Sequence, residues 1–146
     1  MRSRRQDPPS RADLRIRGHR GNRVVCRALI RFARWLRTEY EFPMRVPVYL
    51  SPNEHVTTVS GERASASFFA PFDREVEPFI RIATGDYTEL RARRGRDNAL
   101  ASFVCSFAHE VIHYRQWIET GEVWEDGVAR RAVRILRNYA RSTDRQ

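Results

Sequence analysis

The chain lacks lysine, has only two cysteines and contains no long apolar run, and each of these absences narrows what it can be. Cys26 and Cys105 are far apart in apolar helical patterns, so we expect buried free thiols rather than a disulfide framework, as suits a reducing cytosol. No stretch reaches the ~18 apolar residues that a membrane span needs, and residues 1–20 lack the apolar core of a signal peptide. We therefore expect a soluble, cytoplasmic protein without a membrane partner.

What the chain does have is a large positive charge and enough apolar residues for one core. Its 146 residues leave room for a single compact domain, and 41% of them are hydrophobic. All 27 basic residues are arginine, and the net charge is +9. Such a surplus attracts phosphates, anionic lipids and acidic proteins. Because an all-arginine composition is also typical of GC-rich coding, the charge alone does not identify the partner.

The first part of the sequence divides into a tail and a helix. Residues 1–21 are rich in arginine and interrupted by Pro8 and Pro9, which predicts a disordered tail ahead of a domain over residues 22–142. A helix is predicted over residues 22–38 because its apolar residues recur at helical spacing. The tail offers a contact for nucleic acid through its arginines.

Three strands and three further helices complete the expected α+β fold. Strands are predicted over residues 45–50, 64–70 and 79–83, with Pro47 favouring an edge, a bulge or a shorter first strand. A short helix is predicted over 86–94. Asp97 or Asn98 would cap a long helix that runs to about residue 119 and ends at Thr120-Gly121, and a last helix would run from about 123–125 to 141.

The long predicted helix contains the pentad His109-Glu110-Val111-Ile112-His113. Four residues are close to one helical turn, so both imidazoles project from the same face and can share one zinc ion. Glu110 lies one residue along, where its carboxylate can act as a general base on a metal-activated water without binding the metal itself. The pentad therefore predicts two zinc ligands and a catalytic base.

A catalytic zinc ion needs a third protein ligand, and the acidic residues after the pentad are the candidates. Glu119 lies on the same helix at an unfavourable height and angle, and Glu122 lies in the turn. We favour Glu125, at the start of the last helix, with Asp126 as second choice or as an acceptor for a ligating imidazole. Both carboxylates could instead complement the dipole of that helix.

Three stretches between about residues 64 and 139 resemble gluzincins, one branch of the zincin metallopeptidases. Residues 109–117 (HEVIHYRQW) resemble the active-site helix of small phage and bacterial members. Residues 125–132 are similar to their E-x-x-A-x-x-x-A glutamate helix, although Val128 stands where alanine is usual. Residues 64–70 and 79–83 resemble the edge strand and its neighbour, where zincins hold extended peptides.

The resemblance implies a minimal zincin-like domain that hydrolyses peptide bonds with one Zn²⁺ per chain and with Glu125 as third ligand. The sequence does not choose an oxyanion-stabilising residue among the four candidates Tyr87, Tyr114, Arg115 and Tyr139. The alternative is a DNA- or RNA-associated zinc-binding module that uses its arginine-rich surface, either SprT-like or without catalysis. A structural zinc ion usually has four protein ligands, and this sequence has no Cys or His cluster to supply them.

Overall fold

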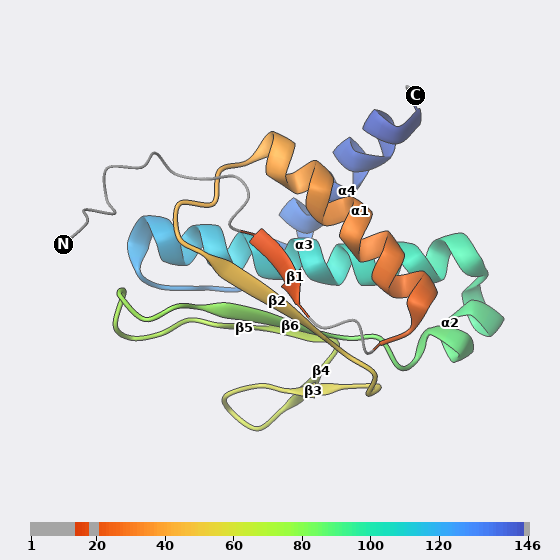
Figure 1. The fold of residues 1–146 in the computed structure, drawn as a ribbon, viewed down its shortest axis with the longest axis horizontal. Coiled ribbons are helices and arrows are strands. Elements are labelled where there is room, and N and C mark those ends of the chain that lie inside the picture. The colour runs from red at the N-terminus through yellow and green to blue at the C-terminus, as the bar shows by residue number, and fades with distance from the viewer. Residues whose placement is uncertain (1–13, 18–20, 145–146) are drawn as a thin grey trace.

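The computed structural model describes residues 14–17 and 21–144. The described residues form four helices and six strands, which confirms the predicted α+β class (Figure 1). The elements follow the order β1 (Leu14–Arg17), α1 (Arg23–Glu39), β2 (Val46–Ser51), β3 (Val56–Thr57), β4 (Arg63–Ala64), β5 (Ala66–Phe69), β6 (Phe79–Ala83), α2 (Tyr87–Arg94), α3 (Arg96–Thr120) and α4 (Val128–Asp144).

Four strands form a mixed sheet in the order β1-β2-β6-β5. β1, β2 and β6 are parallel, whereas β5 runs antiparallel to β6 at one edge. Alternate residues of β2 and β6 are buried, including Val48, Ile80 and Ile82, because one face of the sheet packs against α1 and α3 (Figure 1). The short β3–β4 hairpin forms a separate two-stranded sheet.

Strand β1 corrects the prediction of a disordered tail over residues 1–21. Leu14 is 0% exposed, pairs with Val46 of β2, and accepts a hydrogen bond from the Arg37 guanidinium through its carbonyl at 2.9 Å. Two apolar residues alternating with arginine are too weak a local pattern to indicate a strand. The residues that pair with β1 follow much later in the chain, as Val46 does for Leu14, so no local pattern contains them. The rest of the predicted tail, residues 1–13 and 18–20, lies outside the described residues.

The predicted elements from residue 22 to residue 94 are largely confirmed, with two corrections. Pro47 does not place β2 at an edge, since β2 lies between β1 and β6 and loses only one ladder hydrogen bond there. The predicted strand over 64–70 is divided at Ser65 into β4 and β5, which belong to different sheets. Both cysteines are free, Cys26 buried and Cys105 partly buried.

Helix α3 crosses the sheet and is the central element of the core. It begins at Arg96, directly after Gly95, so Asp97 and Asn98 lie inside the helix and neither is its cap. The helix ends as predicted at Gly121, whose φ of 84° is left-handed and whose N–H donates to the carbonyl of Trp117. Among the described helices, none offers the continuous apolar length that a membrane span requires.

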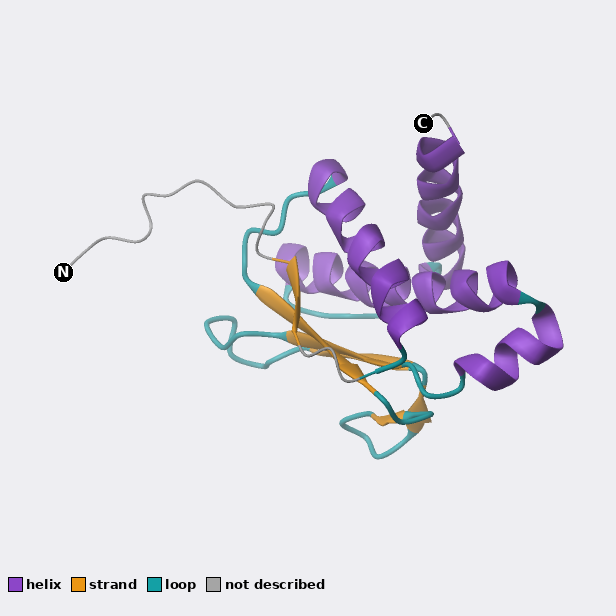
Figure 2. Ribbon diagram, turned by 45° about the vertical axis from the view of Figure 1, so that its right-hand side comes forward, coloured by secondary structure: helices purple, strands orange, loops and turns teal. Residues whose placement is uncertain are grey.

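The last helix begins later than predicted, and this changes where Glu125 lies. Gly127 has a φ of 81°, a left-handed conformation that a helix does not continue through, so α4 begins at Val128. Glu125 therefore lies in the loop between α3 and α4 rather than on a glutamate helix. Figure 1 shows this loop running back alongside α3, and in Figure 2 α4 rises from α3 on the side away from the sheet.

Candidate metal centre

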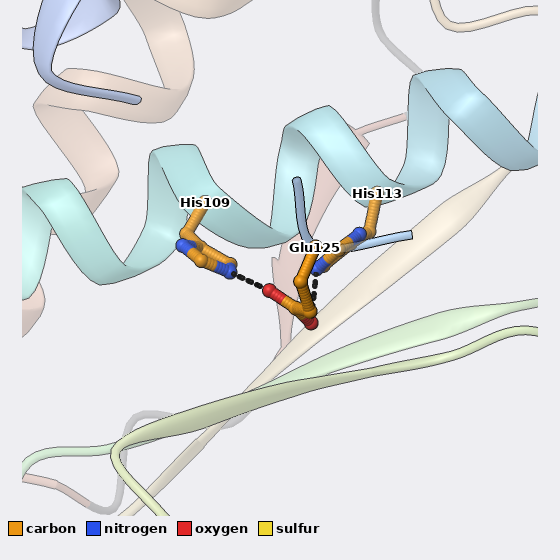
Figure 3. Close-up of side chains that lie close together, drawn as sticks. All are labelled: His109, His113 and Glu125. Atoms are coloured by element: carbon orange, nitrogen blue, oxygen red, sulfur yellow. Dashed lines mark hydrogen bonds and ion pairs between the residues drawn. The ribbon is translucent and has the colours of Figure 1, made fainter. Parts of the chain in front are cut away.

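His109 and His113 lie one turn apart on the face of α3 that is directed toward the sheet (Figure 3). Their ring centroids are 5.0 Å apart. His113 is only 5% exposed, and His109 is partly buried. The predicted spacing therefore does bring both imidazoles to one place on the helix.

Glu125 completes the group from the α3–α4 loop. Its Oε1 lies 3.1 Å from His109 Nε2, and its Oε2 lies 3.0 Å from His113 Nε2 (Figure 3). One ligand atom from each of the three residues lies within 4.8 Å of the others. Among the described residues, this group includes neither Asp126 nor the other two acidic candidates, Glu119 and Glu122. Of the two carboxylates that the sequence left open, the fold brings Glu125 to the histidines.

Gln116 connects this loop to the second imidazole through a single oxygen. Its Oε1 accepts a hydrogen bond from the Trp124 amide at 3.1 Å and lies 2.9 Å from His113 Nδ1. An amide N–H can only donate, so the oxygen of Gln116 faces both groups as an acceptor, and His113 Nδ1 carries the proton. In the neutral imidazole, Nε2 is then an unprotonated acceptor that faces Glu125.

Two acceptors 3.0 Å apart repel one another unless a proton or a cation lies between them. Two imidazole nitrogens and one carboxylate are a known ligand set of catalytic zinc, with water in the fourth position. Ligands about 2.0–2.1 Å from a tetrahedral zinc ion lie about 3.4 Å from one another. The two separations of 3.1 and 3.0 Å, each to a different oxygen of Glu125, are a little shorter than that value, and the donor set of the three residues is one that suits a zinc ion.

Glu110 lies beside this group but is not part of it. Its side chain is 8% exposed and lines the same cleft as the two histidines. Burial, and secondarily the negative charge of Glu125, raises the pKa of Glu110 to about 8. A pKa near neutrality suits a group that takes up a proton as a carboxylate and then gives the proton back.

The two histidines, Glu110 and Glu125 open into a cleft of about 890 Å³. One wall is α3, and β5 with the β3–β4 hairpin forms the other. Apolar side chains gather along it, namely Val59, Phe68, Phe69, Phe79 and Val123. The cleft also holds Arg81, which the sequence analysis did not single out; its guanidinium donates to the Thr57 carbonyl at 2.9 Å.

The four oxyanion-stabilising candidates all lie outside this cleft. Tyr114 is buried, and its hydroxyl group donates to the carbonyl of Met44. Tyr139 packs against Phe32 and Trp35, Tyr87 against Phe103, and the Arg115 guanidinium lies over the ring of Tyr40. The sequence alone did not show that these four side chains lie away from the cleft, because they belong to other faces of their helices.

Comparison with protein-family models, with curated proteins and with solved structures gave no match.

Proposed function

We propose that this chain is a zinc-dependent peptidase with a zincin-like fold, in which His109, His113 and Glu125 hold one zinc ion. The observation that carries the proposal is the convergence of these three side chains beside the buried carboxyl group of Glu110. A bound zinc ion would supply Lewis acidity, which acidifies water and polarises a carbonyl group.

Glu110 is the general base and acid of the proposed reaction. Its carboxylate takes a proton from the attacking water and passes it to the amine that leaves as the peptide bond breaks. Glu110 is held for this role by α3, one residue after His109, and burial keeps bulk water from competing for its carboxylate.

The edge strand β5 supports a peptide or protein as the substrate. Among the described strands, β5 pairs only with β6, so its other edge is free to form main-chain hydrogen bonds with an extended chain. This edge borders the cleft opposite α3, and the apolar lining of the cleft can take up apolar side chains. A peptide bound there would lie along the row of His109, Glu110 and His113.

The proposal is tested by measuring zinc content and peptide hydrolysis in wild type and in Glu110→Gln. We expect about one zinc ion per chain in both and loss of hydrolysis in the variant, because the base is removed and the ligands stay. Glu119→Gln, which changes an exposed carboxylate on the same helix, is the matched control and should alter neither quantity. Wild type that binds no zinc when purified without chelator would refute the proposal.

The second reading, a zinc-binding module without catalysis, makes a different prediction. Wild type would then bind zinc but hydrolyse no peptide under any condition that supports binding. The group of three ligands argues against this reading, since a structural zinc ion usually has four protein ligands.

A further inference from the structure

Helix α4 carries a straight row of arginines on its exposed side. Arg130, Arg134, Arg137 and Arg141 follow one another at intervals of four, three and four residues, and all four are exposed. This spacing keeps them on one face over three turns, a length of about 16 Å. We call these four residues the arginine stripe.

The arginine stripe has no ion-pair partner among the side chains that the structure describes. The only acidic residue of α4 is its last one, Asp144. Among the described residues, no carboxylate lies within ion-pair distance of the four guanidinium groups. Like charges at this spacing destabilise a helix, so the row costs stability unless an anion neutralises it. The four arginines also line a shallow depression of about 540 Å³ with Val133 and Asn138.

We propose that the arginine stripe binds the phosphate backbone of a nucleic acid. Guanidinium groups bind phosphate oxygens in a bidentate manner, and a regular row of them matches a polymer with regularly spaced phosphates. Asn138, in the same depression, adds a hydrogen-bond donor for phosphate or sugar.

The structure favours nucleic acid over a membrane or an acidic protein. The apolar side of α4, which includes Val128, Ala132 and Ile135, is buried in the core, so the helix has no apolar face to insert into lipid. Among the residues lining the depression, Val133 is the only apolar one, whereas the centre of a protein interface is rich in aromatic and apolar side chains.

The arginine stripe and the cleft lie on different sides of α3. The two histidines are directed toward the strands (Figure 3), whereas α4 rises from α3 away from the sheet (Figure 2). A nucleic acid on α4 would therefore leave the cleft open. The nucleic acid would hold the chain near other proteins bound to the same nucleic acid. It would not be the substrate that enters the cleft.

The test compares two variants that lower the net charge by the same amount. One replaces the four arginines of the stripe by glutamine, and the control replaces Arg91, Arg93, Arg94 and Arg96, which are also exposed. Binding of a labelled DNA duplex and of the matching single strand is measured by fluorescence anisotropy from about 50 to about 200 mM salt. Anionic lipid vesicles serve as the third ligand, and circular dichroism checks folding.

We expect the stripe variant to lose the steep salt dependence of nucleic-acid binding, and the control to keep most of it. Four phosphate contacts contribute about −3.6 to the slope of log K against log salt for a duplex and about −2.8 for a single strand. Over this range the affinity of wild type for duplex should fall about 150-fold more than that of the stripe variant. The stripe binds whichever form, duplex or single strand, shows its own expected change in slope in the stripe variant.

Two results would overturn the proposal. Equal losses in the two variants would mean that diffuse charge, not the stripe, attracts nucleic acid. Loss of vesicle binding in the stripe variant, with nucleic-acid binding unchanged, would assign the surface to lipid. Zinc content should be the same in all three proteins, so the outcome does not depend on the metal centre.

Discussion

Replacing Gln116 by methionine should weaken zinc binding although Gln116 itself does not touch the metal position. Its Oε1 accepts hydrogen bonds from His113 Nδ1 and from the amide of Trp124, the residue before Glu125. One oxygen therefore orients an imidazole on α3 and also holds the loop that brings the carboxylate. Methionine has a similar volume and shape but cannot replace this acceptor, so the change removes the hydrogen bonds without opening a large cavity.

The magnitude of this effect follows from the burial of the groups. Gln116 is 2% exposed and His113 5%, so the ring N–H of His113 would lose its acceptor where water does not reach it. An unsatisfied buried donor costs about 1–3 kcal/mol in the free energy of unfolding. Loss of a group that orients a ligating histidine typically lowers metal affinity about 10–100-fold, or about 1.4–2.7 kcal/mol.

Competition with a chromophoric chelator measures the zinc affinity, and urea unfolding of the metal-free proteins measures the stability. Gln116→Glu is the rescue variant, because its carboxylate can accept both hydrogen bonds and makes His113 a more basic ligand. We expect Gln116→Met to lose affinity and Gln116→Glu to regain it. Unchanged zinc affinity in a folded Gln116→Met protein would refute the positioning role.

Three further predictions follow from other parts of the structure. Glu125→Ala should lower zinc affinity at least about 100-fold, whereas Asp126→Ala should leave it within about threefold; equal losses by chelator competition would contradict the assignment. In metal-free protein, folding raises the pKa of Glu110 from about 4.5 to about 8. The folded state therefore keeps its full stability below pH 4.5, and ionisation of the buried Glu110 lowers the free energy of unfolding as the pH rises to 8. Glu110→Gln should therefore gain stability over wild type across this window, on the order of 4–5 kcal/mol in urea unfolding at pH 8, and a difference independent of pH would exclude the burial argument. Leu14→Ala should cost about 2–5 kcal/mol and Arg15→Ala less than about 0.5; similar small losses would show that β1 does not contribute to the core.

The sequence by itself determined the features that depend on local periodicity. The pentad places His109 and His113 together because the α-helix repeats every 3.6 residues, whatever the rest of the chain does. The apolar pattern also predicted α1 and β6, and Thr120-Gly121 predicted the end of α3, since each of these requires only neighbouring residues.

Only the tertiary structure decided what depends on residues far apart in sequence. Strand β1 exists because β2 provides its hydrogen bonds and α1 covers Leu14, and no local pattern contains that information. Glu125, rather than Asp126, lies against the two histidines because Gly127 delays the start of α4 and Gln116 ties the loop to α3. From the sequence alone, two neighbouring carboxylates are equally good candidates for one site. Which of them points into the site depends on the path of the backbone, and packing across the whole domain sets that path.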